Sequence, residues 1–250
     1  MVSKIVLRAV SPGPYPCKIC DAPALRFGEV DFNRSCGEPR AETLPPLGVS
    51  VQFRRCTGCG FLFTECYDDW SDAEFKHFIY NSDYIRIDPD YADRRPREQA
   101  SMLIKQFQAD RAVLRMLDYG GGSGLLSQHL RNAGFTTAEA FDPFTPELSQ
   151  RPHGRFDVIT CFETMERLTD PLVQIDDMVD MLSDIGVVLF STLLQPPDLA
   201  SRGMSWWYIG PRNGHVSLFT RASLAFAWRR HGFAVSSVSE AMHLAFRNDT

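Results

Sequence analysis

Residues 118–124 read Asp-Tyr-Gly-Gly-Gly-Ser-Gly, and this stretch decides the fold. It follows an apolar run, residues 112–117, and precedes an amphipathic run, residues 125–133, in the order strand, glycine turn, helix. Glycines in such a turn let the backbone approach a ligand closely, because no Cβ is in the way. The helix that follows directs its free N–H groups and its positive dipole end towards the turn. The sequence therefore predicts a ligand site at this turn.

Three classes of ligand would suit a glycine turn in this place: a nucleoside triphosphate, a dinucleotide, and a nucleoside such as S-adenosylmethionine (SAM). A phosphate loop would end in Gly-Lys-Ser/Thr, whereas this turn ends Gly122-Ser123-Gly124 and has no lysine. The dinucleotide spacing Gly-x-Gly-x-x-Gly is matched only imperfectly. Asp118 would repel a pyrophosphate but suits a ligand that carries an ammonium and a sulfonium. These features favour SAM and leave an NAD-binding protein as the weaker alternative.

A second acidic residue, Asp142, closes the next short apolar strand, residues 137–141. It lies about 20 residues beyond the glycine turn, where a carboxylate can accept hydrogen bonds from both ribose hydroxyls. NAD-binding and SAM-binding enzymes share this arrangement, so Asp142 indicates an adenosine without choosing between them. Because Pro143 follows it, Asp142 would also suit a simple turn.

In this order, the motifs resemble those of class I SAM-dependent methyltransferases. The resemblance extends from about residue 80 to residue 250 and includes residues 156–166, 187–192 and 215–220. It implies that the first glycines hold the methionine part of SAM and that Asp142 holds the ribose. It also implies that the segment ending at Tyr84 closes over the cofactor. The cofactor-binding residues predicted on this basis are Asp118, Gly120, Gly121, Gly122, Asp142, Pro143, Phe162, Glu163 and Tyr84.

The N-terminal part carries two Cys-x-x-Cys pairs, Cys17-Lys-Ile-Cys20 and Cys56-Thr-Gly-Cys59, with 35 residues between them. Four thiolates in two such pairs suit tetrahedral zinc, and four cysteines leave no open position for catalysis. We therefore predict structural Zn²⁺ on these residues, with Cys36 as the one surplus cysteine that could replace a ligand. A zinc module ahead of a methyltransferase core is similar to zinc-bearing sugar C-methyltransferases, in which the small N-terminal domain helps to enclose the substrate.

The overall composition is that of a globular α/β protein. The chain has 250 residues, 44% of them hydrophobic, and a formal net charge of −5. This charge gives no general basic field, so nucleic acid is not a favoured partner. No apolar run approaches the about 20 residues of a membrane helix, and the N-terminal segment lacks the features of a signal peptide. We expect a cytoplasmic protein without a membrane partner.

The expected fold is a Rossmann-like methyltransferase sheet, mostly parallel with an antiparallel last strand, plus a small zinc-ribbon-like module. We assign residues 1–70 to the four-cysteine zinc module, 71–111 to a helical connector or lid that breaks at Pro89 and Pro96, and 112–250 to the SAM-binding core. Only 14 residues separate Asp142 from Asp157, and three of them are prolines. A crossover needs a dozen residues and a strand besides, so we expect the third strand and its helix to be missing or vestigial. Phe144 and the loop around it would then wall the adenine.

Methyl transfer to oxygen or carbon needs an aligned nucleophile and removal of a proton. His215 is the candidate base, and Tyr208, in the aromatic run 206–208, is a second candidate catalytic residue. The same run would suit a lid or the contact of a homodimer. In the zinc-bearing sugar C-methyltransferases a Glu precedes the corresponding His, whereas Gly214 stands here. Glu163 and Glu166 would suit a cofactor or active-site role, a solvated edge or a helix start. Arg167, where many relatives have His, could bind an anionic substrate group.

The sequence thus predicts a SAM-dependent methyltransferase that acts on an O or C atom of a small molecule, sugar-like or aromatic. The alternative within the same fold is a protein that binds SAM or its product, S-adenosylhomocysteine (SAH), without turnover.

Overall fold

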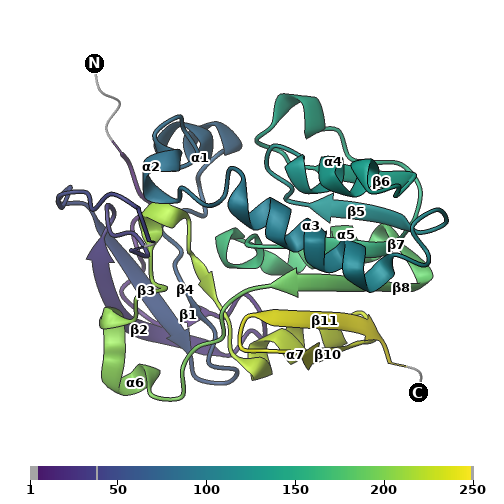
Figure 1. The fold of residues 1–250 in the computed structure, drawn as a ribbon. Coiled ribbons are helices and arrows are strands. Elements are labelled where there is room, and N and C mark those ends of the chain that lie inside the picture. Colours follow the sequence, from purple (N-terminus) through teal and green to yellow (C-terminus); the bar gives the residue numbers. More distant parts are fainter. Residues whose placement is uncertain (1–4, 38, 249–250) are drawn as a thin grey trace. The chain divides into compact units, whose positions relative to one another are not determined.

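The computed structural model describes residues 5–37 and 39–248 (Figure 1). The chain divides into two compact units, and neither is continuous in the sequence. The division differs from the three consecutive segments predicted above, because β9 (Ser217–Leu218) pairs with β4 (Leu62–Phe63) in the first unit. The first unit comprises Met1–Pro89, Glu166–Leu172 and Leu193–Ala227, and the second comprises Asp90–Met165, Val173–Thr192 and Trp228–Thr250.

An antiparallel five-stranded sheet, in the order β1-β2-β3-β4-β9, forms the centre of the first unit. Its buried face is aromatic: Phe61 stacks on Phe63 with ring centroids 5.4 Å apart. The first helix begins at Asp72 because the Ser71 hydroxyl accepts from the Glu74 N–H, while the Glu74 carboxylate accepts from the Ser71 N–H. The elements of this unit are β1 (Tyr15–Pro16), β2 (Pro23–Asp31), β3 (Ser50–Cys56), β4, α1 (Asp72–Phe78), α2 (Tyr84–Ile87), α6 (Leu199–Arg202), η3 (Gly203–Ser205), η4 (Pro211–Asn213) and β9.

The second unit contains a six-stranded sheet in the order β10-β11-β8-β7-β5-β6. Strands β6, β5, β7 and β8 run parallel, and β11 pairs with β8 in the antiparallel direction. The expected mostly parallel sheet with an antiparallel last strand is therefore confirmed. The elements are α3 (Arg94–Phe107), β5 (Arg115–Tyr119), α4 (Leu125–Asn132), β6 (Thr137–Phe141), η1 (Pro146–Leu148), β7 (Phe156–Cys161), β8 (Leu182–Ser191), β10 (Phe233–Ser237) and β11 (Met242–Arg247). Three elements cross between the units: η2 (Met165–Arg167), α5 (Pro171–Asp180), most of which belongs to the second unit, and α7 (Arg221–Arg229), most of which belongs to the first.

The expected loss of a third strand is also confirmed. Residues 142–155, all of which the structure describes, contain the single short turn η1 and no strand. Strand β6 is therefore the edge of the sheet. The carboxyl ends of β6, β5, β7 and β8 lie at one edge, where open α/β sheets bind their ligands.

Helices α3 and α4 cover one face of this sheet, as Figure 1 shows. Leu103 from α3 and Leu130 from α4 share a hydrophobic cluster with Met116 and Val158 from the strands. The sequence suggested a helix break at Pro96, but α3 continues through it. Pro96 occupies the first turn, where the N–H that proline lacks has no partner in a helix anyway. Among the described residues, no helix has the length and apolar composition to cross a membrane.

Candidate functional site

The glycine turn lies at the carboxyl end of β5, in the second unit. The N–H groups of Gly120 and Gly121 both donate to the carbonyl of Phe141, at 2.8 and 3.1 Å, which fastens the turn to the end of β6. Gly120 and Gly122 have φ of 74° and 56°, in the left-handed region. A Cβ on Gly120 would lie 2.4 Å from Oγ1 of Thr164. Nothing lies within 4 Å of the position that a Cβ on Gly122 would take, so this face of the turn is open.

The Asp142 carboxylate closes the other side of the turn. Its Oδ2 accepts from the Gly122 N–H at 2.9 Å, and its Oδ1 accepts from the Phe144 N–H at 2.8 Å. Each carboxylate oxygen can accept more than one hydrogen bond, so the same group is also able to bind a diol. The hydroxyl of Thr145 donates to the Gly122 carbonyl at 2.7 Å, a contact that the sequence did not suggest. The short segment after β6 is therefore hydrogen-bonded to the glycine turn through Asp142 and Thr145.

Asp118 is the second carboxylate of this site. It is buried, its Oδ1 accepts from the Thr160 hydroxyl at 2.9 Å, and its Oδ2 lies 2.6 Å from where a Cβ on Gly121 would be. The pKa of Asp118 is raised to about 7, mainly by burial; the Thr160 hydrogen bond opposes this shift, and the nearby Asp142 charge adds to it. A buried carboxylate in this state gains from a cationic ligand that would compensate its charge.

The remaining predicted cofactor residues do not share one environment. The Phe162 side chain belongs to the hydrophobic cluster under α3 and α4, whereas Pro143 is exposed. Glu163 is partly exposed at the end of β7. Tyr84 lies in the first unit, where its hydroxyl donates to the Asn213 carbonyl at 3.4 Å. Contacts of these four residues with a cofactor stay a prediction.

The four predicted metal ligands meet in the first unit. The Sγ atoms of Cys17, Cys20, Cys56 and Cys59 all lie within 4.8 Å of one another. Cys17 and Cys59 are 3.7 Å apart, and Cys20 and Cys56 are 3.5 Å apart, which is far longer than a disulfide. Sulfur atoms around a tetrahedral zinc with bonds of about 2.3 Å would be separated by about 3.8 Å. The cluster can therefore hold a metal ion of this size.

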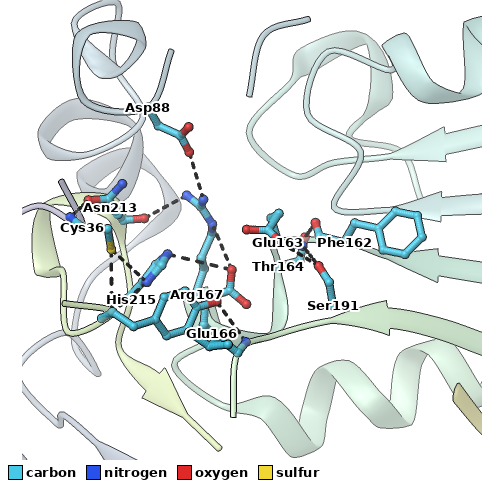
Figure 2. Close-up of polar contacts among 12 residues, drawn as sticks. Cys36, Asp88, Phe162, Glu163, Thr164, Glu166, Arg167, Ser191, Asn213 and His215 are labelled. Carbon is cyan, nitrogen blue, oxygen red and sulfur yellow. Dashed lines mark hydrogen bonds and ion pairs between the residues drawn. The ribbon is translucent and has the colours of Figure 1, made fainter. Parts of the chain in front are cut away.

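Cys36 is not part of that cluster but lies beside His215. Its Sγ is 3.3 Å from His215 Nδ1, and the same nitrogen is 3.0 Å from the Tyr208 carbonyl. Since a carbonyl only accepts, Nδ1 carries the proton and Nε2 is the nitrogen that can exchange one. Nε2 lies 3.9 Å from Oε1 of Glu166. A buried carboxylate thus faces His215 although Gly214 precedes it, and it comes from a distant part of the sequence (Figure 2).

Arg167 also lies in the first unit, and its guanidinium has several partners there. Its guanidinium donates to the Tyr84 hydroxyl and to the Asn213 carbonyl, the latter at 2.8 Å, and lies 3.5 Å from Oδ2 of Asp88 (Figure 2). Its side chain is only 13% exposed. These partners therefore bind the guanidinium that we expected, from the sequence, to bind an anionic substrate group. The solvated-edge interpretation of Glu166 is also wrong, because the residue is fully buried.

The aromatic run before His215 is divided by burial. Trp206 and Tyr208 are buried, while Trp207 is half exposed. The Tyr208 ring packs against the imidazole of His215 with centroids 4.3 Å apart, and its hydroxyl accepts from the Leu193 N–H at 3.3 Å. Tyr208 therefore holds the imidazole by its ring and by its carbonyl. Both contacts of Tyr208 with His215, through the ring and through the carbonyl, are therefore structural.

Comparison with known proteins identifies the family. A model described as "Methyltransferase domain" matches residues 91–238, more than half of the chain. The protein belongs to this methyltransferase family. No curated protein matches the sequence.

Solved structures give weaker similarities. Magnesium protoporphyrin IX methyltransferase from Synechocystis PCC 6803 with bound SAH is 14% identical, with a TM-score of 0.44, over 62% of this chain and 85% of that chain. The pyocyanin biosynthetic protein PhzM is 16% identical, with a TM-score of 0.45, over 71% and 64% of the two chains. CalO1, a methyltransferase of calicheamicin biosynthesis, is 15% identical, with a TM-score of 0.45, over 66% and 60%.

Proposed function

We propose that the protein is a SAM-dependent methyltransferase that modifies an oxygen or carbon atom of a small molecule. The observation that carries the proposal is the pair of buried carboxylates on either side of the glycine turn. Asp142 suits the two ribose hydroxyls, and Asp118 suits the cationic methionine part. A pyrophosphate at the same turn would face Asp118, so this carboxylate argues against NAD. SAM, when bound, would supply the methyl group.

In this proposal Gly120, Gly121 and Gly122 give the cofactor access to the backbone, and their open face is where its methionine part would lie. His215 is the proposed base, through Nε2, with Tyr208 orienting its ring. Glu166 would stabilise the protonated imidazole at 3.9 Å. The acceptor class that we propose, sugar-like or aromatic, rests on the resemblance and on the aromatic run that precedes His215.

We further propose that Cys17, Cys20, Cys56 and Cys59 bind one structural Zn²⁺. Four thiolates complete a tetrahedral shell and leave no site for a water molecule, so the metal would contribute folding energy and not chemistry. Backbone N–H groups already point at the cluster: those of Gly58 and Cys59 donate to Cys56 Sγ at 3.3 and 3.4 Å. Such donors stabilise thiolate charge.

One observation favours the alternative, a protein that binds SAM or SAH without turnover. His215 is only 3% exposed, and its Nδ1 is occupied by the Tyr208 carbonyl. A base so enclosed must become accessible before it can take a proton from an acceptor. The enclosure of His215 therefore suits a protein that binds SAM or SAH without turnover.

Calorimetric titration with SAH, and in parallel with NAD, tests the cofactor. We expect one SAH per chain and no heat from NAD; binding of NAD without SAH would contradict the proposal. Methyl transfer from SAM with a labelled methyl group, to a panel of small metabolites, then separates the enzyme from the non-catalytic alternative. A protein that binds SAH but labels no compound would favour that alternative.

A further inference from the structure

Glu163 has an unusual backbone conformation for its residue type. Its φ is 50°, and within the described part of the second unit it is the one non-glycine residue with positive φ. For a residue with a Cβ, the left-handed region costs on the order of 1 kcal/mol. Strain of this kind persists only where the surroundings impose it, and it gathers at functional sites. The conformation of Glu163 therefore needs a cause.

Ser191, the last residue of β8, provides that cause. The Glu163 N–H donates to the Ser191 hydroxyl oxygen at 2.7 Å, and the same hydroxyl donates to Glu163 Oε1 at 2.8 Å (Figure 2). The two bonds fix the backbone and the carboxylate together. The second oxygen, Oε2, has no hydrogen-bond partner among residues 5–37 and 39–248, and the side chain is partly exposed. The two hydrogen bonds with Ser191 thus orient a carboxylate oxygen that is available to a ligand.

The order of the strands indicates which part of the site Glu163 borders. Asp142 follows β6, the glycine turn follows β5, and Glu163 follows β7, on the opposite side of β5 from β6. Two strand spacings, about 10 Å, separate the ends of β6 and β7. The adjacent Thr164 packs against Gly120, so Glu163 borders the glycine turn on the side away from Asp142. An adenosine held by Asp142 would lie on the opposite side of the turn from Glu163.

We propose that Glu163 binds the methyl acceptor, and that its Oε2 accepts a hydrogen bond from a hydroxyl or amine of that molecule. The proposal rests on the proposed function, since it takes Asp142 as the ribose site. It refines the resemblance, which grouped Glu163 with the cofactor residues. The acceptor class that follows is a small molecule with a hydrogen-bond donor near the reacting atom. A site built to accept such a bond rejects analogues that lack the donor, because the carboxylate would stay unpaired.

The test compares wild type, Glu163→Gln and a matched control, Asp184→Asn, which removes an exposed carboxylate near the opposite end of β8. SAH affinity is measured by calorimetry. Methyl transfer from labelled SAM is measured with phenols, hydroxylated aromatic acids and free sugars, and the KM of each accepted compound is determined. For Glu163→Gln we expect an acceptor KM at least tenfold higher, the loss expected for a hydrogen bond to a charged group. We expect SAH affinity to change less than twofold, and Asp184→Asn to match wild type.

Each other outcome has a distinct meaning. A loss of SAH affinity in Glu163→Gln as large as the rise in acceptor KM would make Glu163 a cofactor residue and overturn the proposal. An unchanged KM would overturn it as well. If wild type binds SAH but methylates none of the hydroxylated compounds, the acceptor class is wrong and the role of Glu163 with it. If wild type does not bind SAH, the proposed function itself fails first.

Discussion

At the scale of single residues, the buried carboxylates decide how the site behaves. Asp118 and Asp142 have different surroundings although both face the glycine turn. Asp142 accepts hydrogen bonds from two backbone N–H groups. Asp118 has the Thr160 hydroxyl as a donor and is otherwise buried, which favours its neutral form. Asp118 should therefore respond to pH and to a cationic ligand.

The pKa of Asp118, raised to about 7 by burial, predicts that affinity for SAM and SAH depends on pH. A ligand ammonium favours the carboxylate, so affinity should increase as pH rises from 6 to 8 and level off above the pKa. Below it, each pH unit should weaken binding by up to tenfold. Calorimetry at several pH values measures this. An Asp118→Asn variant should bind weakly with no such dependence, and a pH-independent wild type would contradict the role of Asp118.

The raised pKa of Asp118 also predicts how the stability of the folded protein changes with pH. Between pH 4 and 7 the folded ligand-free protein keeps a proton on Asp118 that an unfolded chain has released. The free energy of unfolding should therefore fall as pH rises through that window.

Single residues also show where sequence reasoning ends. The glycines and Asp142 follow local patterns, because turn, strand end and spacing are adjacent in the chain. The contact between Cys36 and His215 joins residues 179 apart, and no local pattern predicts it. Gly214 suggested that His215 lacks a carboxylate neighbour, yet folding brings Glu166 to it. Such partners are set by tertiary packing, which one sequence does not reveal.

At the scale of elements, the site depends on how the turns after β5, β6 and β7 fit together. The glycine turn is bonded to the end of β6, clasped by Asp142 and Thr145, and packed against Thr164 after β7. The absence of a strand between β6 and β7 follows from length, which is why the sequence predicted it. The exact ends of helices were less predictable, as Pro96 within α3 shows, because proline is compatible with a first helical turn.

The close fit predicts the effect of a methyl group at the turn. Gly120→Ala would place a Cβ 2.4 Å from Thr164 Oγ1 at a φ of 74°. Gly232→Ala is a matched control, since Gly232 has a φ of 76° and nothing within 4 Å of the same position. We expect strain to cost each variant about 1 kcal/mol of stability, with a further loss in Gly120→Ala from the contact with Thr164, and only Gly120→Ala to weaken SAH binding, by at least tenfold. Thermal unfolding and calorimetry check this. Equal SAH affinity in the two variants would contradict the role of the turn.

At the scale of the whole molecule, two units that interleave along the chain share the proposed function. The second unit holds the glycine turn, and the first holds the cysteine cluster and His215. A division into consecutive segments was the natural expectation from sequence. It differs from the structure because residues 193–227 join the N-terminal sheet through β9, a pairing of two residues that carries no sequence signal.

Removing the metal should destabilise the first unit, which contains the four cysteines. We expect one zinc per chain by elemental analysis, and a lower melting temperature after chelation, because metal-binding energy is folding energy in such clusters. Cys17→Ser should lose the metal. Cys66→Ser, which removes a buried thiol outside the cluster, should keep it and serves as the control. A metal-free protein with unchanged stability would show that the four cysteines have another role.

The most direct test of the central claim, that SAM binds at the glycine turn with its ribose on Asp142, is calorimetric titration of SAH into wild type and Asp142→Ala. Asp184→Asn again controls for the loss of a carboxylate. The account predicts one SAH per wild-type chain and at least tenfold weaker binding to Asp142→Ala, a difference of about 1.4 kcal/mol. Equal affinity of folded wild type and Asp142→Ala, or no SAH binding by folded, zinc-loaded wild type, would contradict it.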